Sequence, residues 1–178
     1  PRIFTMSISM SSASLPVFQA MLGNLSHFLD KAEGFVGAKK CDPTALTQFR
    51  LAPDMLPFTR QISIACDAAK MGVARLAGVE APSFPDTEVT LAELKERIAK
   101  TIAFIASVPA AKLDGTEDKD ITFPAGRDVT KTMKGEAYLK HWVTPNFYFH
   151  LTMAYAILRH NGVELGKPEY LLGARTAA

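Results

Sequence analysis

Apolar residues recur every three or four positions in four long segments of the chain, which is the spacing of one buried helix face. In the first segment this alternation runs from Leu15 to Ala32, for more than two heptads. Gly34 and Gly37 should end that helix, because glycine readily adopts the left-handed conformation of a C-cap. We therefore predict four amphipathic helices, over residues 13–33, 58–77, 91–108 and 145–160.

Local sequence signals mark three further helix boundaries. Thr90 and Glu93 form a capping-box pattern, which predicts the start of the third helix. Thr144 is a good N-cap, and Pro145 suits the first helical position, where its missing N–H costs nothing. The Asn-Gly pair at 161–162 predicts a left-handed stop for the last helix.

The pattern changes between the third and last helices. Residues 120–123 and 128–131 alternate like two short strands around residues 124–126, which predicts a small β-hairpin, with an irregular loop as the alternative. Residues 136–143 are again helical and run into the last helix, with Pro145 as a kink or a restart.

The connections complete the predicted architecture. A short helix is expected over residues 43–50, and residues 80–88 form a crossing loop with two prolines as helix breakers. The residues after 162 should pack only in part. Four helices with one short and two long connections predict an all-α, four-helix bundle with one or two crossovers.

Composition limits the classes of function. The chain of 178 residues fits one domain, and its net charge of +2 provides no positive field for nucleic acid. No apolar run approaches the roughly 20 residues of a membrane span. Two cysteines are too few for a disulfide framework. We predict a cytoplasmic protein that binds neither nucleic acid nor membrane. Residues 1–5 could be a leader or a cloning remnant, with Met6 or Met10 as the natural start.

Polar residues on apolar helix faces are the candidates for chemistry. We expect Asn146 and His150, one turn apart, near the middle of the last helix's apolar arc, where unpaired polar groups would be costly. Gln61 and Cys66 flank the apolar face of the second helix, and Asp67 lies nearly opposite its centre. The alternatives for His150 are a metal ligand and a core histidine hydrogen-bonded to Asn146 or Gln61. Cys66 fits a small buried hydrophobe better than a reactive thiol.

The second and third helices carry residues that predict three kinds of contact. Glu93 with Arg97 and Glu96 with Lys100 have the spacing of exposed ion pairs on the third helix. On the second helix, small residues should permit close contact with a neighbouring helix: Ala65, Ala68, Ala69 and Gly72. A weakly polar second face around Ile64 and Met71 leads us to expect a homodimer through helical faces.

Common catalytic motifs are missing from the sequence: it has no Gly-rich phosphate loop, no G-x-S-x-G, no H-E-x-x-H and no Glu-x-x-His pair. The chain nevertheless resembles a bacterial domain-of-unknown-function family, the one numbered nineteen ninety-three, and more remotely the DinB/YfiT-like superfamily. The resemblance covers Met6 to about Gly173 and is specific in Pro-Asn-Phe-Tyr-Phe-His at 145–150. Further matching segments are residues 51–55, 60–61, 65–67 and 158–162.

The resemblance implies a DinB-like bundle, and in many members of that superfamily one divalent metal on three histidines. Two of these histidines lie four residues apart on the last helix and one lies on the second helix. His150 falls at the later position of the pair, but the earlier position is Asn146. The second helix offers Gln61, Cys66 or Asp67 in place of a histidine. Two of the three implied ligands are therefore replaced.

The sequence thus favours a DinB-like bundle with a polar pocket around Asn146 and His150, no complete metal site and no cofactor. One alternative is a metal-dependent enzyme, a thiol transferase or hydrolase, holding a single Zn or Ni ion on His150, Asn146, Gln61 and Cys66. Another is a dimeric scaffold that binds a ligand or a partner.

Overall fold

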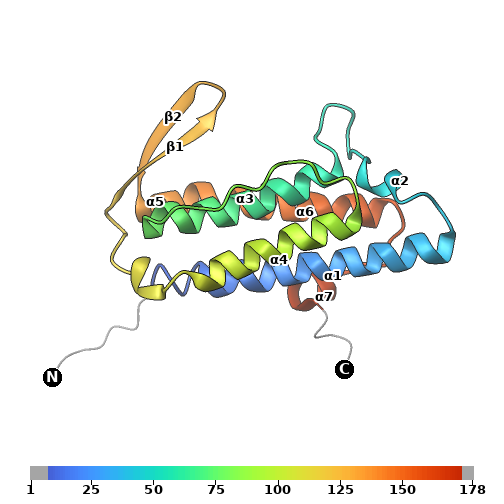
Figure 1. The fold of residues 1–178 in the computed structure, drawn as a ribbon, viewed down its shortest axis with the longest axis horizontal. Coiled ribbons are helices and arrows are strands. Elements are labelled where there is room, and N and C mark those ends of the chain that lie inside the picture. Colours follow the sequence, from blue (N-terminus) through green and yellow to red (C-terminus); the bar gives the residue numbers. More distant parts are fainter. Residues whose placement is uncertain (1–7, 174–178) are drawn as a thin grey trace.

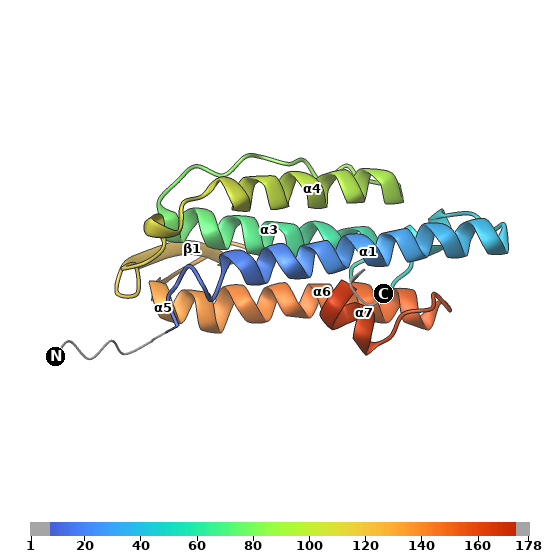
Figure 2. The same ribbon diagram turned by 90° about the horizontal axis from the view of Figure 1, so that it is seen from below.

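The computed structural model describes residues 8–173, and the expectation for residues 1–5 lies outside that range. Within it, four long helices run side by side (Figures 1 and 2). They are α1 (Leu15–Lys39), α3 (Phe58–Ala77), α4 (Leu91–Ser107) and α6 (Thr144–His160). Helix α3 packs against α4 and α6, and α1 packs against α4 and α6, which closes the bundle. The predicted four-helix bundle is confirmed.

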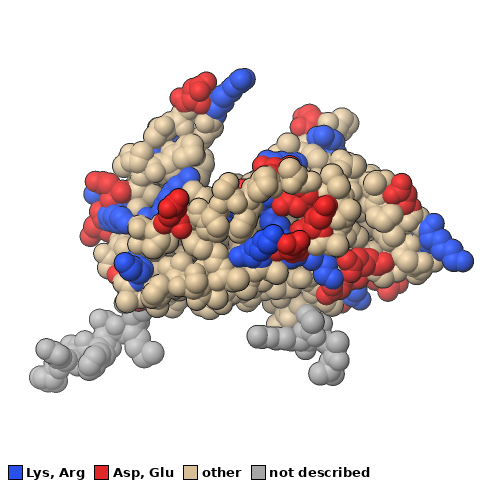
Figure 3. Space-filling model, in the orientation of Figure 1, with Lys and Arg blue, Asp and Glu red and all other residues tan. Residues whose placement is uncertain are grey.

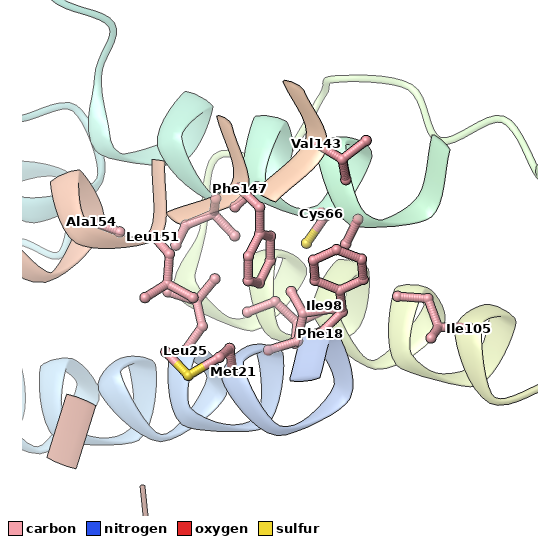
Figure 4. Packing of buried hydrophobic residues seen from close by; sticks show 14 of the residues in the cluster. Phe18, Met21, Leu25, Cys66, Ile98, Ile105, Val143, Phe147, Leu151 and Ala154 are labelled. Atoms are coloured by element: carbon pink, nitrogen blue, oxygen red, sulfur yellow. The ribbon is translucent and has the colours of Figure 1, made fainter. Parts of the chain in front are cut away.

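The apolar faces of the helices meet in one core (Figure 4). In its middle, the rings of Phe18 on α1 and Phe147 on α6 meet edge to face, with their centroids 5.0 Å apart. The predicted apolar face of α3 is fully buried: Phe58, Ile62, Ala65, Ala69, Val73 and Leu76. None of the helices in residues 8–173 is long and apolar enough to cross a membrane.

The predicted hairpin forms before the last long helix, with its second strand and turn shifted from the expected positions. Strand β1 (Asp120–Gly126) pairs antiparallel with β2 (Val129–Lys134). Asp128 occupies the turn with φ +59°, a conformation that aspartate tolerates better than most residues. The hairpin rises from the end of the bundle that holds α5 (Gly135–Tyr138) (Figure 1). Charged side chains of opposite sign meet at its tip (Figure 3).

Helix α1 continues to Lys39, so the prediction that it ends at Gly34 is wrong. A glycine inside a helix lowers the helix stability by only about 1 kcal/mol relative to alanine. Phe35 and Val36 still pack against the core after Gly34, so burial outweighs that cost. The helix ends where Lys40 adopts φ +52°, and its N–H donates to the carbonyl of Val36.

No N-cap forms at Thr144, contrary to the prediction, because the chain is already helical there. A π-helical turn, η2 (Leu139–Val143), joins α5 to α6. Pro145 cannot donate a backbone hydrogen bond. The wider π-turn directly before it accommodates the proline, so the helix continues without a break. The segment before Pro145 is therefore neither a restart nor a simple kink.

The remaining elements are short. Helix α2 (Thr44–Thr47) is shorter than predicted, and the 3₁₀ turn η1 (Ala110–Lys112) follows α4. Helix α7 (Lys167–Leu172) packs against α1, where the Asn24 amide donates to the Tyr170 carbonyl at 2.9 Å. Leu171 and Leu172 stay exposed, so the tail packs in part, as predicted.

Candidate functional site

Helices α3 and α6 run antiparallel, and their contact brings most of the candidate residues together. We use the name α3–α6 seam for the side chains that meet there. From α3 these are Gln61, Ile64, Asp67, Ala68, Met71 and Arg75; from α5, η2 and α6 they are Tyr138, Trp142, Asn146 and His150. The two backbones lie close at Gly72, where an added Cβ would overlap the side chain of Val143. The predicted role of small α3 residues in close helix contact is confirmed there.

Gln61 and His150 meet at one end of the seam. Gln61 is buried, and its Nε2 donates to the Leu56 carbonyl at 2.9 Å. This bond fixes the amide so that Oε1 faces His150 Nδ1 at 2.8 Å. Because Oε1 can only accept, Nδ1 carries the hydrogen. Burial, with a smaller contribution from the Arg60 charge, lowers the pKa of His150 and favours the neutral ring.

His150 is half-buried at the edge of the α6 interface and does not lie in the centre of the core. The buried face of α6 consists of Phe147, Leu151, Ala154, Ile157 and Leu158. At 100° per residue, Phe149 falls in the same predicted apolar arc as His150, but its side chain is 51% exposed. The arc inferred from helical spacing was thus too wide, because aromatic residues occur on both sides of α6. Of the two expected partners of His150, Gln61 is confirmed, and no Asn146–His150 hydrogen bond occurs within residues 8–173.

Asn146 lies one turn further along the seam, on a cavity of about 190 Å³ shared with Asp67 and Arg75. The carboxylate of Asp67 lies 3.0 Å from Arg97 Nη2 and 2.9 Å from Lys70 Nζ. Two cations therefore neutralise Asp67 at the cavity's edge. The apolar wall of the cavity is formed by Ile64, Ala68, Met71, Pro124, Trp142 and Val143.

Arg75 and Tyr138 form the other polar end of the seam. The guanidinium of Arg75 donates through Nη1 to the Tyr138 hydroxyl at 3.0 Å. Burial raises the pKa of Tyr138 despite the opposing effect of the Arg75 charge, so the phenol stays protonated at neutral pH. The ring of Tyr138 packs on Phe123 of the hairpin, with centroids 4.7 Å apart, and Phe123 also contacts Trp142. The hairpin therefore fixes this end of the site.

Cys66 lies apart from the seam, among the apolar side chains of the core (Figure 4). Burial raises the pKa of its thiol to about 12, against smaller lowering effects from Thr101 and Arg97. A neutral, buried thiol is a poor nucleophile and a poor metal ligand. This environment is that of a small hydrophobe.

Sequence reasoning missed Arg97. The predicted exposed pair with Glu93 is wrong, because Arg97 is only 2% exposed and Glu93 instead accepts from the Thr90 N–H in the predicted capping box. Arg97 pairs with Asp67 on α3 and with two carboxylates of the crossing loop: Glu88 at 2.9 Å and Asp86 at 3.2 Å. Its spacing from two buried neighbours, three residues after Leu94 and four before Thr101, was the signal that could have found it. The predicted Glu96–Lys100 pair is confirmed at 2.6 Å.

The comparisons with known proteins agree with the helical-bundle fold. A family model described as a domain of unknown function, DUF1993, matches residues 10–171. The chain belongs to the DUF1993 family. Among solved structures, this DUF1993 chain is similar to the crystal structure of a DinB family member protein from Shewanella denitrificans, with 42% sequence identity and a TM-score of 0.85. The match covers 90% of each chain, so the fold is DinB-like. No curated protein gives a significant match.

The seam of this DUF1993 protein does not fit the three-histidine metal site that a DinB-like fold implies. Residues 8–173 contain no group of three or more His, Cys, Asp or Glu side chains placed to hold a metal ion. Gln61 uses its oxygen to orient His150, which is a supporting role and leaves only His150 Nε2 as a strong donor. Asn146 offers an amide oxygen, which suits hard ions rather than zinc or nickel.

Proposed function

We propose that this DUF1993 protein binds a small molecule in the α3–α6 seam without the aid of a metal ion. The observation that carries the proposal is the cavity beside Asn146, which combines an amide, a neutralised carboxylate and a guanidinium with an apolar wall. A largely apolar pocket with a few convergent polar groups is the usual form of a small-molecule site. The Gln61–His150 hydrogen bond engages the amide oxygen of Gln61, so α3 offers no strong ligand beside His150, where a DinB-like metal would be expected.

The metal-dependent alternative, a thiol transferase or hydrolase, needs three strong ligands and one open coordination position. The seam supplies one imidazole nitrogen, and the buried thiol of Cys66 faces the core. These features favour binding without metal over metal-dependent catalysis.

Thermal unfolding with and without Zn²⁺ or Ni²⁺ tests the proposal. The wild-type midpoint should not rise, whereas a ligand at one hundred times its Kd would add about 2.7 kcal/mol of stability. The double variant Gln61→His/Asn146→His, which restores three histidines, is the positive control, and the same variant with His150→Ala is its negative control. A metal-induced rise in the wild-type midpoint that His150→Ala abolishes would overturn the proposal.

A further inference from the structure

We infer that the α3–α6 seam selects small carboxylates with an apolar body, with Arg75 as the anion-binding residue. This inference rests on the proposed function and names the class of ligand. Helix α3 carries three cations, and two of them have carboxylate partners: Arg60 pairs with Asp86, and Lys70 pairs with Asp67. No carboxylate in residues 8–173 lies within ion-pair distance of Arg75. Its charge is therefore available at the cavity.

Tyr138 holds the Arg75 guanidinium in place. The phenol oxygen accepts a hydrogen bond from Nη1 at 3.0 Å, so its own hydrogen is left to donate. Tyr138 itself is 1% exposed, and its ring is fixed against the hairpin. A fixed guanidinium beside a free phenol hydrogen offers two converging donors, which suit the two oxygens of a carboxylate.

The surrounding charges favour an anion at this end of the seam. Arg75 lies in the last turn of α3, where the carbonyl groups carry partial negative charge. Lys119 Nζ binds the Leu76 carbonyl there at 3.1 Å and counters that charge. Lys131 Nζ lies 5.7 Å from the centroid of the Trp142 ring and adds a second cation near the cavity.

The negative charge of Asp67 does not prevent a ligand carboxylate from binding at Arg75. Asp67 precedes Arg75 by eight residues on α3, which corresponds to about 12 Å along a helix. Its charge is already balanced by Lys70 and Arg97. The carboxylate of a ligand therefore belongs at the Arg75 end, with its body directed along the seam toward Asn146.

The size and lining of the cavity limit the body of the ligand. Its volume of about 190 Å³ is below the ~300–1,000 Å³ usual for drug-sized ligands, which favours a ligand smaller than a nucleotide or a peptide. The indole of Trp142 and the side chain of Met71, one turn before Arg75 on α3, provide apolar lining of the same cavity. A single aromatic ring or a short aliphatic chain bearing one carboxylate fits these limits.

Trp142 can report ligand binding by fluorescence, because it is the chain's only tryptophan and it lines the cavity. Tryptophan emission would be followed while the full chain is titrated with benzoate, and separately with benzamide, its uncharged analogue. Benzoate should give a saturable change, and benzamide should bind at least about tenfold more weakly, since it lacks the charge that Arg75 recognises.

Variants assign the effect to Arg75. Arg75→Gln should weaken benzoate binding by about tenfold or more, Arg75→Lys should retain part of it, and Arg159→Gln on the exposed face of α6 should leave it unchanged. No saturable response to benzoate, or equal binding by wild type and a folded Arg75→Gln, would overturn the inference. Equal binding of benzoate and benzamide would overturn the carboxylate preference and leave metal-free binding standing. A metal site at His150 would defeat the proposed function but would not alter the Trp142 titration.

Discussion

His150 is a half-buried imidazole whose Nδ1–H points to a fixed amide oxygen. Gln61 can hold it in this way only because the Leu56 carbonyl occupies the other end of the amide. The Leu56 carbonyl and the Gln61 amide together fix the tautomer of His150 that carries its hydrogen on Nδ1. This arrangement leaves Nε2 with its lone pair while the ring is neutral.

The lowered pKa of His150 predicts a pH dependence of stability. In the unfolded chain the ring titrates near 6.5, and in the folded protein it titrates lower. Between these two pH values the unfolded state binds more protons than the folded state. The contribution of His150 to the free energy of unfolding is therefore complete above about pH 6.5 and is lost as the pH falls toward the folded-state pKa. Urea unfolding from pH 8 to pH 5 should show this loss in the wild type and a smaller loss in His150→Gln.

An NMR titration of the His150 ring checks the same prediction without a variant. Its midpoint should lie below the ordinary value for histidine. A midpoint at or above about 6.5 would contradict the assigned environment, because a protonated ring would then be favoured beside Gln61.

At the scale of elements, the close contact of α3 with α6 depends on Gly72. A Cβ added there would overlap Val143 Cγ1 and lie 3.0 Å from Cγ2 of the same buried side chain. Valine is stiff at χ1 and cannot turn away freely. The helices would have to separate, and the cavity of the seam would change with them.

Two glycine substitutions in helices should therefore have opposite effects. Gly72→Ala should destabilise the protein by about 1–3 kcal/mol through overpacking, and Val143→Ala in the same chain should recover part of the loss. Gly23→Ala in α1 has nothing within 4 Å of the new Cβ, so it should stabilise by up to about 1 kcal/mol through helix propensity. Chemical denaturation of the variants measures both effects, and the same sign for both substitutions would contradict the close contact.

Arg97 ties the crossing loop to α3 and α4. Its guanidinium meets Asp67 and Glu88, and the ring of Phe84 from the loop lies 4.2 Å from Lys70 Nζ. Arg97→Leu should cost about 3–5 kcal/mol, because it leaves the largely buried Glu88 without a cation and removes one of the two cations that neutralise Asp67. Lys100→Ala, which removes only the exposed pair with Glu96, should cost less than about 1 kcal/mol. Equal losses by urea denaturation would argue against this role of Arg97.

Much of the element order could be predicted from periodicity and local signals. The capping box at Thr90, the hairpin and the stop at Gly162 depend on neighbouring residues, and the sequence contains those signals directly. The end of α1 and the continuity through Thr144 could not be predicted locally, since packing after Gly34 and the π-turn before Pro145 decide them.

The candidate site was harder to predict, because contacts between segments far apart in the sequence form it. Helical spacing put His150 within the apolar arc of its helix and Gln61 at the edge of the apolar face of α3, but only the antiparallel pairing of α3 and α6 brings them within 2.8 Å. Arg75 and Tyr138 lie far apart in sequence, and nothing local relates them. The five candidate residues thus divide into three environments: Gln61 with His150, Asn146 with Asp67, and Cys66 in the core.

At the scale of the whole molecule, we expect two copies to associate through helical faces. Ile64 and Met71, which motivated this expectation, line the seam. At its Gln61–His150 end, Leu56 and Phe149 remain 43% and 51% exposed. Sedimentation at tens of micromolar should give about twice 19.4 kDa, and Phe149→Asp with Leu56→Asp should lower that mass. A wild-type species of 19.4 kDa at that concentration would contradict a homodimer.

The proposed function requires that the α3–α6 seam binds its ligand without the metal ion of a DinB-like fold. Elemental analysis of the purified protein, with His150→Ala measured in parallel, tests this requirement. We predict much less than one transition metal per chain, unchanged in the variant, whose unfolding free energy falls by about 1–3 kcal/mol because Gln61 loses its partner. One Zn or Ni per chain, removed by a chelator and lost in His150→Ala, would contradict metal-free binding and favour a metal-dependent enzyme.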